Sequence, residues 1–288
     1  MRPGGANGVG PFAFAPPTCP ATGTARFPTM QQDEVTATLS RSFGAVADEY
    51  DRLRPGPSKE ALDWLLPDGA AAVLELGAGT GILTRLLAGR VPRVVAVEPD
   101  DRMRAVLSAR ATGVEVLAGR AERIPLADDT VDAVFAASAW HWVDEEKAVP
   151  EVARVLHTGG RLSLVWSGPN RSVDWMRELW AGGIVLMPEE QASIDERRRG
   201  RHVVNVGAPG EGPFLTPETH LFTWTRTMTA DDLIALSTTY SAVITMDEDE
   251  RNRHLDAMRL YLDTRAPFAG CDRIEVPMRS YCWRAMKG

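Results

Sequence analysis

The sequence predicts an α/β fold: a doubly wound, mostly parallel sheet of seven strands with helices on both faces. Two observations predict it. From about residue 57 onward, apolar runs of strand length alternate with segments of helical periodicity. A glycine-rich loop also joins the first expected strand to the helix that follows. Strands that alternate with helices form parallel sheets because each connecting helix packs back on a sheet face.

The first half of this alternation supplies five of the expected strands. Ser58 and Asp100 are the expected N-caps of two helices, and Gly89 and Gly159-Gly160 are expected to end two others. Right-handed crossovers leave few topologies for such a chain. The strands are expected at 72–76, 91–97, 114–117, 131–136 and 162–166, and the helices at 60–65, 80–87, 101–110 and 144–156.

The alternation of strands and helices is less regular after Trp166, and a polar stretch at 189–212 separates the remaining elements. A helix is expected before this stretch, and two strands and two helices after it. These elements are expected at 175–180, 221–224, 230–237, 247–262 and 274–283.

Composition excludes several classes of protein. A chain of 288 residues can bury one large core, or one core and a smaller cap. The net charge of -7 argues against a dedicated nucleic-acid partner. No apolar run reaches the length of a membrane span, so we expect no membrane partner. Three cysteines without a CxxC pair predict no metal site and free thiols in the cytoplasm.

Residues 1–30 differ from the rest of the chain. They are rich in Pro, Gly, Ala and Thr, and they carry almost no charge. The apolar stretch at 12–15 is shorter than the core of a secretory signal. We therefore expect a disordered tail, followed by one domain over 31–288.

The most informative segment is the loop Glu75-Leu76-Gly77-Ala78-Gly79-Thr80-Gly81. Three glycines at alternate positions let a ligand lie against bare backbone at the carboxyl end of a parallel strand. Glu98 ends the second strand, seventeen residues past Gly81, where a carboxylate can accept both hydroxyls of an adenosine ribose. The sequence therefore predicts a Rossmann-like nucleotide site.

A dinucleotide site is the competing interpretation, which would make the chain an NAD(P)-dependent oxidoreductase. That fingerprint is GxGxxG, but Ile82 occupies the position of the third glycine here. Glu75, just ahead of the loop, is also poorly placed for a diphosphate. It suits a ligand that carries an ammonium or a sulfonium.

The segment 73–81 resembles the first motif of class I methyltransferases, and 95–99 resembles the second. The resemblance implies S-adenosylmethionine as the cofactor. Its methionine portion would lie on the loop and its ribose on the acid that ends the second strand. A side chain one turn into the next helix would pack on adenine. The residues implied for this cofactor are Glu75, Gly77, Ala78, Gly79, Gly81, Glu98, Pro99 and Met103.

The segment 119–126 resembles the stretch that borders adenine in that family. Arg120 replaces the acid that the family often has there, so Glu122 or only the backbone around Ala121 would serve the adenine edge. Ala121 is the preferred choice. The segment 138–144 resembles the A-x-H-W-x-D motif of small-molecule methyltransferases similar to trans-aconitate methyltransferase.

This motif places Ser138 at the cofactor and His141 as a general base or an orienter of the substrate. The alternative is that His141 is a packed structural residue. The segment 42–55 resembles an N-terminal helix that folds over the cofactor, with Tyr50 close to the methionine carboxylate and Arg54 near that group or an acidic substrate. A packed helix face is the simpler interpretation of the same spacing.

The resemblance implies a cofactor core at about 57–168 and acceptor-side elements at about 38–56 and 170–265. The expected function is methyl transfer to a small-molecule acceptor, either a carboxylic acid or a hydroxyl. Only a hydroxyl would need His141 as a base. The cluster at 197–201 could attract an acidic acceptor or RNA, although such charge runs are usually solvated. An RNA acceptor and a catalytically inactive cofactor-binding protein stay as alternatives.

Overall fold

A computed structural model of the chain describes residues 47–181, 204–206, 212–265 and 267–288. The expected tail at 1–30, the start of the N-terminal helix and the arginine cluster at 197–201 lie outside the described residues. Within them, no helix has the length and apolar character needed to cross a membrane.

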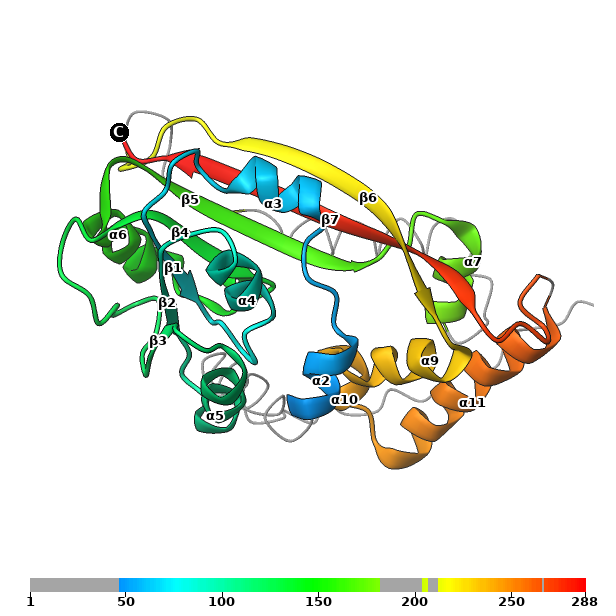
Figure 1. Cartoon of the computed structure of the whole chain (residues 1–288). Coiled ribbons are helices and arrows are strands. Elements are labelled where there is room, and N and C mark those ends of the chain that lie inside the picture. The colour runs from blue at the N-terminus through cyan, green and yellow to red at the C-terminus, as the bar shows by residue number, and fades with distance from the viewer. Residues whose placement is uncertain (1–46, 182–203, 207–211, 266) are drawn as a thin grey trace, which may run out of the picture.

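Seven strands form one sheet in the order β3-β2-β1-β4-β5-β7-β6 (Figure 1). Strands β1 to β5 pair in parallel, whereas β7 runs antiparallel to both β5 and β6. The sheet is therefore mixed, and the prediction of seven mostly parallel strands is confirmed in that form. The strands are β1 (Ala72–Leu76), β2 (Arg93–Val97), β3 (Glu115–Leu117), β4 (Val131–Ala137), β5 (Leu156–Pro169), β6 (Glu218–Met228) and β7 (Ile274–Met286).

The helices follow the predicted pattern closely, and two predicted caps are confirmed. The Ser58 side chain accepts from the Ala61 backbone N–H, and Asp100 accepts from the N–H groups of Arg102 and Met103. The helices are α2 (Ala47–Leu53), α3 (Lys59–Leu65), α4 (Ile82–Ala88), α5 (Asp101–Arg110), α6 (Glu145–Val155), α7 (Asp174–Trp180), α9 (Ala230–Thr238), α10 (Ser241–Ile244) and α11 (Glu248–Thr264), with a 3-10 turn η2 (Trp140–Trp142).

Two predicted helix boundaries were wrong. Helix α4 begins at Ile82, not at Thr80, because Gly81 adopts a left-handed conformation (φ +89°) and caps the helix. Helix α6 ends at Val155, before Gly159-Gly160, because Leu156 is already extended and pairs with Val131 of β4.

Helices cover both faces of the sheet, as predicted. Helices α3 and α4 bury their apolar side chains, including Leu62, Leu65, Leu83 and Leu87, on one face. Helix α6 buries Val152 and its neighbours on the other face. The residues of the glycine loop and of the strands are therefore held in place by a rigid, closely packed core.

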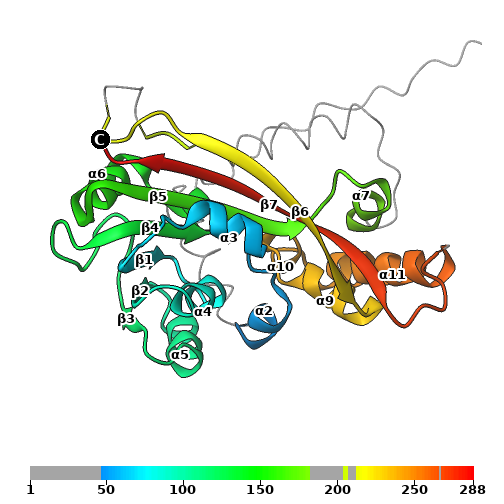
Figure 2. The same ribbon diagram turned by 45° about the horizontal axis from the view of Figure 1, so that its top comes forward.

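A second apolar cluster lies beyond the core of the sheet. The far ends of β6 and β7 extend past the other strands and pack with α7, α9 and α11 (Figures 1 and 2). Leu53 of α2 belongs to the same cluster. This second lobe is built from 47–53, 174–180, 218–265 and 267–278. All but the last of these segments lie within the ranges predicted for acceptor-side elements, and their role there stays a prediction.

Candidate active site

The glycine loop connects β1 to α4 at the point where the strand order reverses, with β2 on one side of β1 and β4 on the other. The backbone N–H groups of Gly77 and Ala78 donate to the carbonyl of Val97 at 2.9 and 3.2 Å. These bonds fix the loop against the end of β2. Ligands in open α/β sheets bind at such a switch point.

The glycines of this loop have different roles. Gly77 has a φ of +63°, and a Cβ there would lie 2.7 Å from Ala139. Gly79 has a φ of +58°, but a Cβ there would meet no atom within 4 Å. Gly81 packs on Leu107, where a Cβ would overlap that side chain. Gly79 therefore faces open space, whereas Gly81 serves the packing between α4 and α5.

Glu98 is tied directly to this loop. Its carboxylate accepts from the backbone N–H of Gly79 and from that of Asp100, each at 2.8 Å. Burial raises the pKa of Glu98, while the two backbone donors oppose the rise. Each carboxylate oxygen keeps a second lone pair, so the group can still accept from two vicinal hydroxyls.

Glu75 is almost wholly buried at the end of β1, with 1% of its surface exposed. The Thr84 hydroxyl donates to its Oε2 at 2.5 Å. Burial raises the pKa of Glu75 to about 8, and the Glu98 carboxylate adds to the rise. Glu75 therefore keeps its proton at neutral pH until a cation comes near it.

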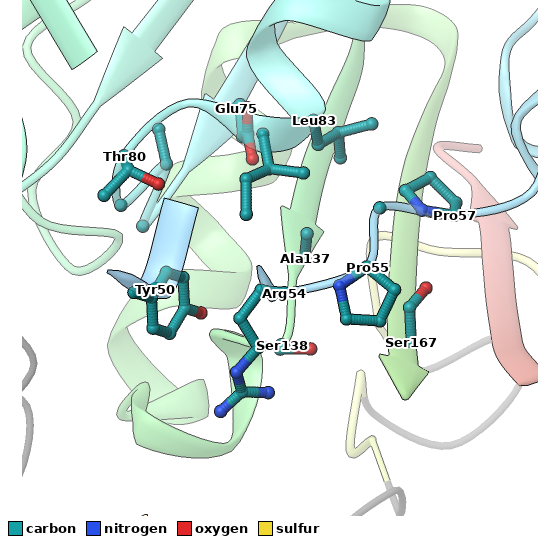
Figure 3. A pocket seen from close by; sticks show the side chains of 15 residues that line it. Tyr50, Arg54, Pro55, Pro57, Glu75, Thr80, Leu83, Ala137, Ser138 and Ser167 are labelled. Atoms are coloured by element: carbon teal, nitrogen blue, oxygen red, sulfur yellow. The ribbon is translucent and has the colours of Figure 1, made fainter. Parts of the chain in front are cut away.

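A pocket opens beside the loop and encloses about 480 Å³, including its mouth (Figure 3). Ser138, which has a left-handed backbone (φ +50°), lies at the end of β4 in this pocket. Such strain in a residue other than glycine is typical of functional sites. Arg54 lines this pocket, together with six of the predicted site residues: Tyr50, Glu75, Gly77, Ala78, Gly79 and Ser138.

The residues predicted for adenosine lie outside the lining of this pocket. Met103 and Ala121 are buried, with 4% and 7% of their surfaces exposed, whereas Pro99 is exposed next to Glu98. The Glu122 carboxylate accepts from the Asp144 backbone N–H at 3.0 Å, ahead of α6. Glu122 thus has a structural partner, which favours Ala121 for the adenine edge.

His141 lies on the 3-10 turn η2 and is exposed. The indole N–H of Trp166 donates to its Nδ1 at 3.3 Å, and the ring of Trp142 lies 4.7 Å from its own, centroid to centroid. A neutral imidazole that accepts at Nδ1 carries its proton on Nε2. His141 is not among the pocket-lining residues, so its catalytic role stays a prediction.

Helix α2 is held over the loop by ion pairs that the sequence analysis missed. Asp51 pairs with Arg85 of α4 at 2.9 Å and with Arg110 of α5. Arg110 also pairs with Asp48 at 2.8 Å. Charged residues spaced along three separate helices give no sequence signal of this network. It positions Tyr50 and Arg54 at the pocket.

The fold is that of an α/β protein with a glycine loop and a pocket at the switch point of its sheet. A family model described as a methyltransferase domain matches residues 74–164. An "uncharacterized methyltransferase" of Mycobacterium tuberculosis is 42% identical over 247 residues, which cover 86% of this chain and 96% of that protein. The chain therefore belongs to the class I, S-adenosylmethionine-dependent methyltransferase family.

Two further similarities are narrower. A malonyl-[acyl-carrier protein] O-methyltransferase of Methylococcus capsulatus is 37% identical over 133 residues, which cover 42% of this chain and 48% of that protein. A solved structure from Anaeromyxobacter dehalogenans, assigned as a type II methyltransferase, is 21% identical with a TM-score of 0.61 and covers 81% of this chain and 97% of its own. The structural likeness shows the fold.

Proposed function

We propose that this protein transfers a methyl group from S-adenosylmethionine to a small-molecule acceptor. One observation carries the proposal: Glu98 is hydrogen-bonded to the backbone of Gly79, and Gly79 faces open space at the switch point of the sheet. A carboxylate that is able to accept ribose hydroxyls thus lies beside bare backbone that a ligand can approach. Family membership favours this cofactor over NAD(P).

The residues present fit the cofactor. Glu98 would hold the ribose, and Gly77 to Gly79 would support the methionine portion. Buried Glu75 would face its positive charge, since an ammonium or sulfonium favours ionisation of that acid. On the adenosine side the holding residues would be Pro99, Met103 and Ala121, and on the methionine side Tyr50 and Ser138.

When bound, S-adenosylmethionine supplies an activated methyl group, and its sulfur takes the electron pair of the broken C–S bond. The protein contributes alignment of the acceptor and exclusion of water. Helix α2, tied down by Asp51, closes one side of the pocket with Tyr50 and Arg54. A carboxylate acceptor needs no base, whereas a hydroxyl acceptor needs one, for which His141 is the candidate.

The acceptor is proposed to be a small carboxylic acid or a hydroxyl compound, as for proteins similar to trans-aconitate methyltransferase. The partial relative from Methylococcus capsulatus is named an O-methyltransferase, which supports an oxygen acceptor. The net charge of -7 favours a small molecule over RNA.

Calorimetry tests the cofactor, with S-adenosylhomocysteine and NAD as probes. We expect S-adenosylhomocysteine to bind and NAD to show no binding, and Glu98→Gln to weaken the first at least tenfold. Glu115→Gln, an exposed carboxylate on β3, is the matched control and should bind as the wild type does. Binding of NAD alone would contradict the proposal. Transfer of labelled methyl groups into a metabolite extract then tests catalysis, and no labelled product would support an inactive cofactor-binding protein.

A further inference from the structure

A cluster of cationic and aromatic side chains joins Arg54, which lines the pocket, to Tyr240 and Trp180 of the second lobe. The Arg54 guanidinium carbon lies 3.6 Å from the centre of the Tyr240 ring. The Arg171 guanidinium carbon lies 5.8 Å from the same ring centre, and the Trp180 ring meets Tyr240 edge-on at 5.9 Å. Tyr240 is therefore flanked by two positive charges.

Tyr240 connects this cluster to the end of β5. A Cβ at Gly168 would lie 2.9 Å from the Tyr240 hydroxyl oxygen, so that hydroxyl approaches the backbone where glycine leaves room. The preceding residue, Ser167, lines the pocket. The Tyr240 hydroxyl is buried and has no hydrogen-bond partner in the described part of the chain. Buried hydroxyls are seldom left in this state.

Arg54 has a second buried donor without a partner. Its Nη2 donates to the Thr239 carbonyl at 2.8 Å, but its Nε finds no acceptor among the described residues. No carboxylate of those residues pairs with its charge. Leaving a buried charged donor unpaired is costly, and a ligand that supplied the missing acceptor would remove this cost.

The acidic and the basic groups of the site lie on different sides of the pocket. The buried carboxyl groups of Glu75 and Glu98 stand on the side of the glycine loop. The Arg54 side chain also lines the pocket, and its guanidinium points away from Glu75 (Figure 3). A cationic cofactor suits the first side, and an anion suits the second.

We propose that Arg54 and Tyr240 form an anchoring site for a carboxylate of the acceptor, an inference that rests on the proposed methyltransferase function. A carboxylate there accepts from the Arg54 Nε–H and from the Tyr240 O–H. Both donors keep their protons, and the anchored group stays ionised. The site selects the acceptor by charge and leaves the methylated atom unassigned.

The methionine carboxylate of the cofactor is a second anionic group that could occupy the site of Arg54 and Tyr240. The position of Arg54 favours a carboxylate of the acceptor as the occupant. Its guanidinium lies closer to Tyr240 than to Tyr50, whose ring centre is 4.9 Å away, and it bonds to Thr239 at the end of α9. It is thus held by the second lobe rather than by the glycine loop.

The test uses calorimetric titration of the full-length protein, first with S-adenosylhomocysteine and then with a panel of three- to six-carbon mono-, di- and tricarboxylic acids. The corresponding neutral amides serve as uncharged probes. Tyr240→Phe removes a single oxygen, and Arg54→Gln removes the charge. Arg253→Gln, an exposed arginine on α11, is the matched control for loss of a positive charge.

We expect at least one acid to bind the wild-type complex more tightly than its amide. Tyr240→Phe and Arg54→Gln should each weaken that acid tenfold or more, as loss of a hydrogen bond to a charged group does. Tyr240→Phe should bind S-adenosylhomocysteine within twofold of the wild type, because Tyr240 lies outside the lining of the pocket, and Arg253→Gln should match the wild type in both titrations. If Arg54→Gln fails to fold, Tyr240→Phe decides alone.

Two results would overturn the inference. One is that no acid binds the wild-type complex more tightly than its amide. The other is that Arg54→Gln weakens S-adenosylhomocysteine tenfold but leaves 5′-methylthioadenosine, which lacks the carboxylate, unchanged. That result would assign the site to the cofactor. Failure of the proposed function gives different results: either S-adenosylhomocysteine does not bind the wild-type protein, or it binds and no labelled methyl group reaches any acceptor.

Discussion

Replacement of Glu75 by glutamine should change the stability of this protein and its affinity for the cofactor in opposite directions. Stability at neutral pH should rise, and affinity should fall. Burial raises the pKa of Glu75 from 4.5 to about 8. In the unfolded chain the same carboxyl ionises near its ordinary pKa. Its contribution to stability is therefore fully present below pH 4.5 and is lost as the pH rises toward about 8.

The size of the effect follows from the width of this window. Each pH unit between the two pKa values lowers the free energy of unfolding by about 1.4 kcal/mol, so the wild type has lost about 3 kcal/mol near neutral pH. Glu75→Gln keeps the shape and removes the titration. Relative to the wild type, the variant should gain about that amount in stability between acid and neutral pH.

Urea unfolding across this pH range measures the difference, with exposed Glu248→Gln as the matched control. Calorimetry in buffers of different ionisation enthalpy measures the second half of the prediction. S-adenosylhomocysteine brings an ammonium, so the wild type should release close to one proton on binding near neutral pH, and Glu75→Gln should release none. We also expect the variant to bind at least tenfold more weakly.

Parallel stability curves for wild type and Glu75→Gln would show that the pKa of Glu75 is not raised. Proton release that is the same in both proteins would show that Glu75 does not meet the positive charge of the ligand. Either result would refute the reasoning that links burial of this acid to binding of a cationic cofactor.

Three further predictions test the loop, the α2 helix and the candidate base. Gly79→Ala should lower the free energy of unfolding by about 1 kcal/mol because its φ is +58°, and should weaken the binding of S-adenosylhomocysteine at least tenfold because the new methyl group fills open space. Gly69→Ala is the control, since Gly69 has a φ of +73° and equal room. It should lower stability in urea unfolding and leave binding unchanged. Asp51→Asn, which breaks the ion pairs of α2 with α4 and α5, should raise the KM for S-adenosylmethionine about tenfold in a methyl-transfer assay, and an unchanged KM would show that α2 does not serve the cofactor. His141→Ala should reduce kcat more than a hundredfold with a hydroxyl acceptor and less than tenfold with a carboxylate, and a small loss with a hydroxyl would exclude the role of general base.

The glycine-loop side of the candidate site was largely predictable because its signals are local. The loop with Gly77 and Gly79 follows the first strand directly, and Glu98 ends the next strand, so chain order and parallel pairing bring them together. Ser138 follows the same logic at the end of β4. Periodicity also located every described strand, although it predicted only the middle of β5 and of β6.

The side of the candidate site that faces the second lobe was not predictable in the same way. Arg54 and Tyr240 are far apart in sequence, and nothing in either segment indicates that their side chains touch. The same holds for Asp51 and its partners on α4 and α5. Such contacts depend on how whole elements pack, which composition and periodicity do not encode separately for each side chain.

The sequence alone indicated the sheet class, the glycine loop and S-adenosylmethionine as the expected methyl donor, because these follow from short patterns read along one strand and its neighbours. The tertiary structure decided the rest. The antiparallel β7, between β5 and β6, extends the sheet into a second lobe. That lobe brings Tyr240 to Arg54, and burial leaves donors on both without partners. Desolvation, which arises only when distant segments pack together, turns these two side chains into a candidate binding site.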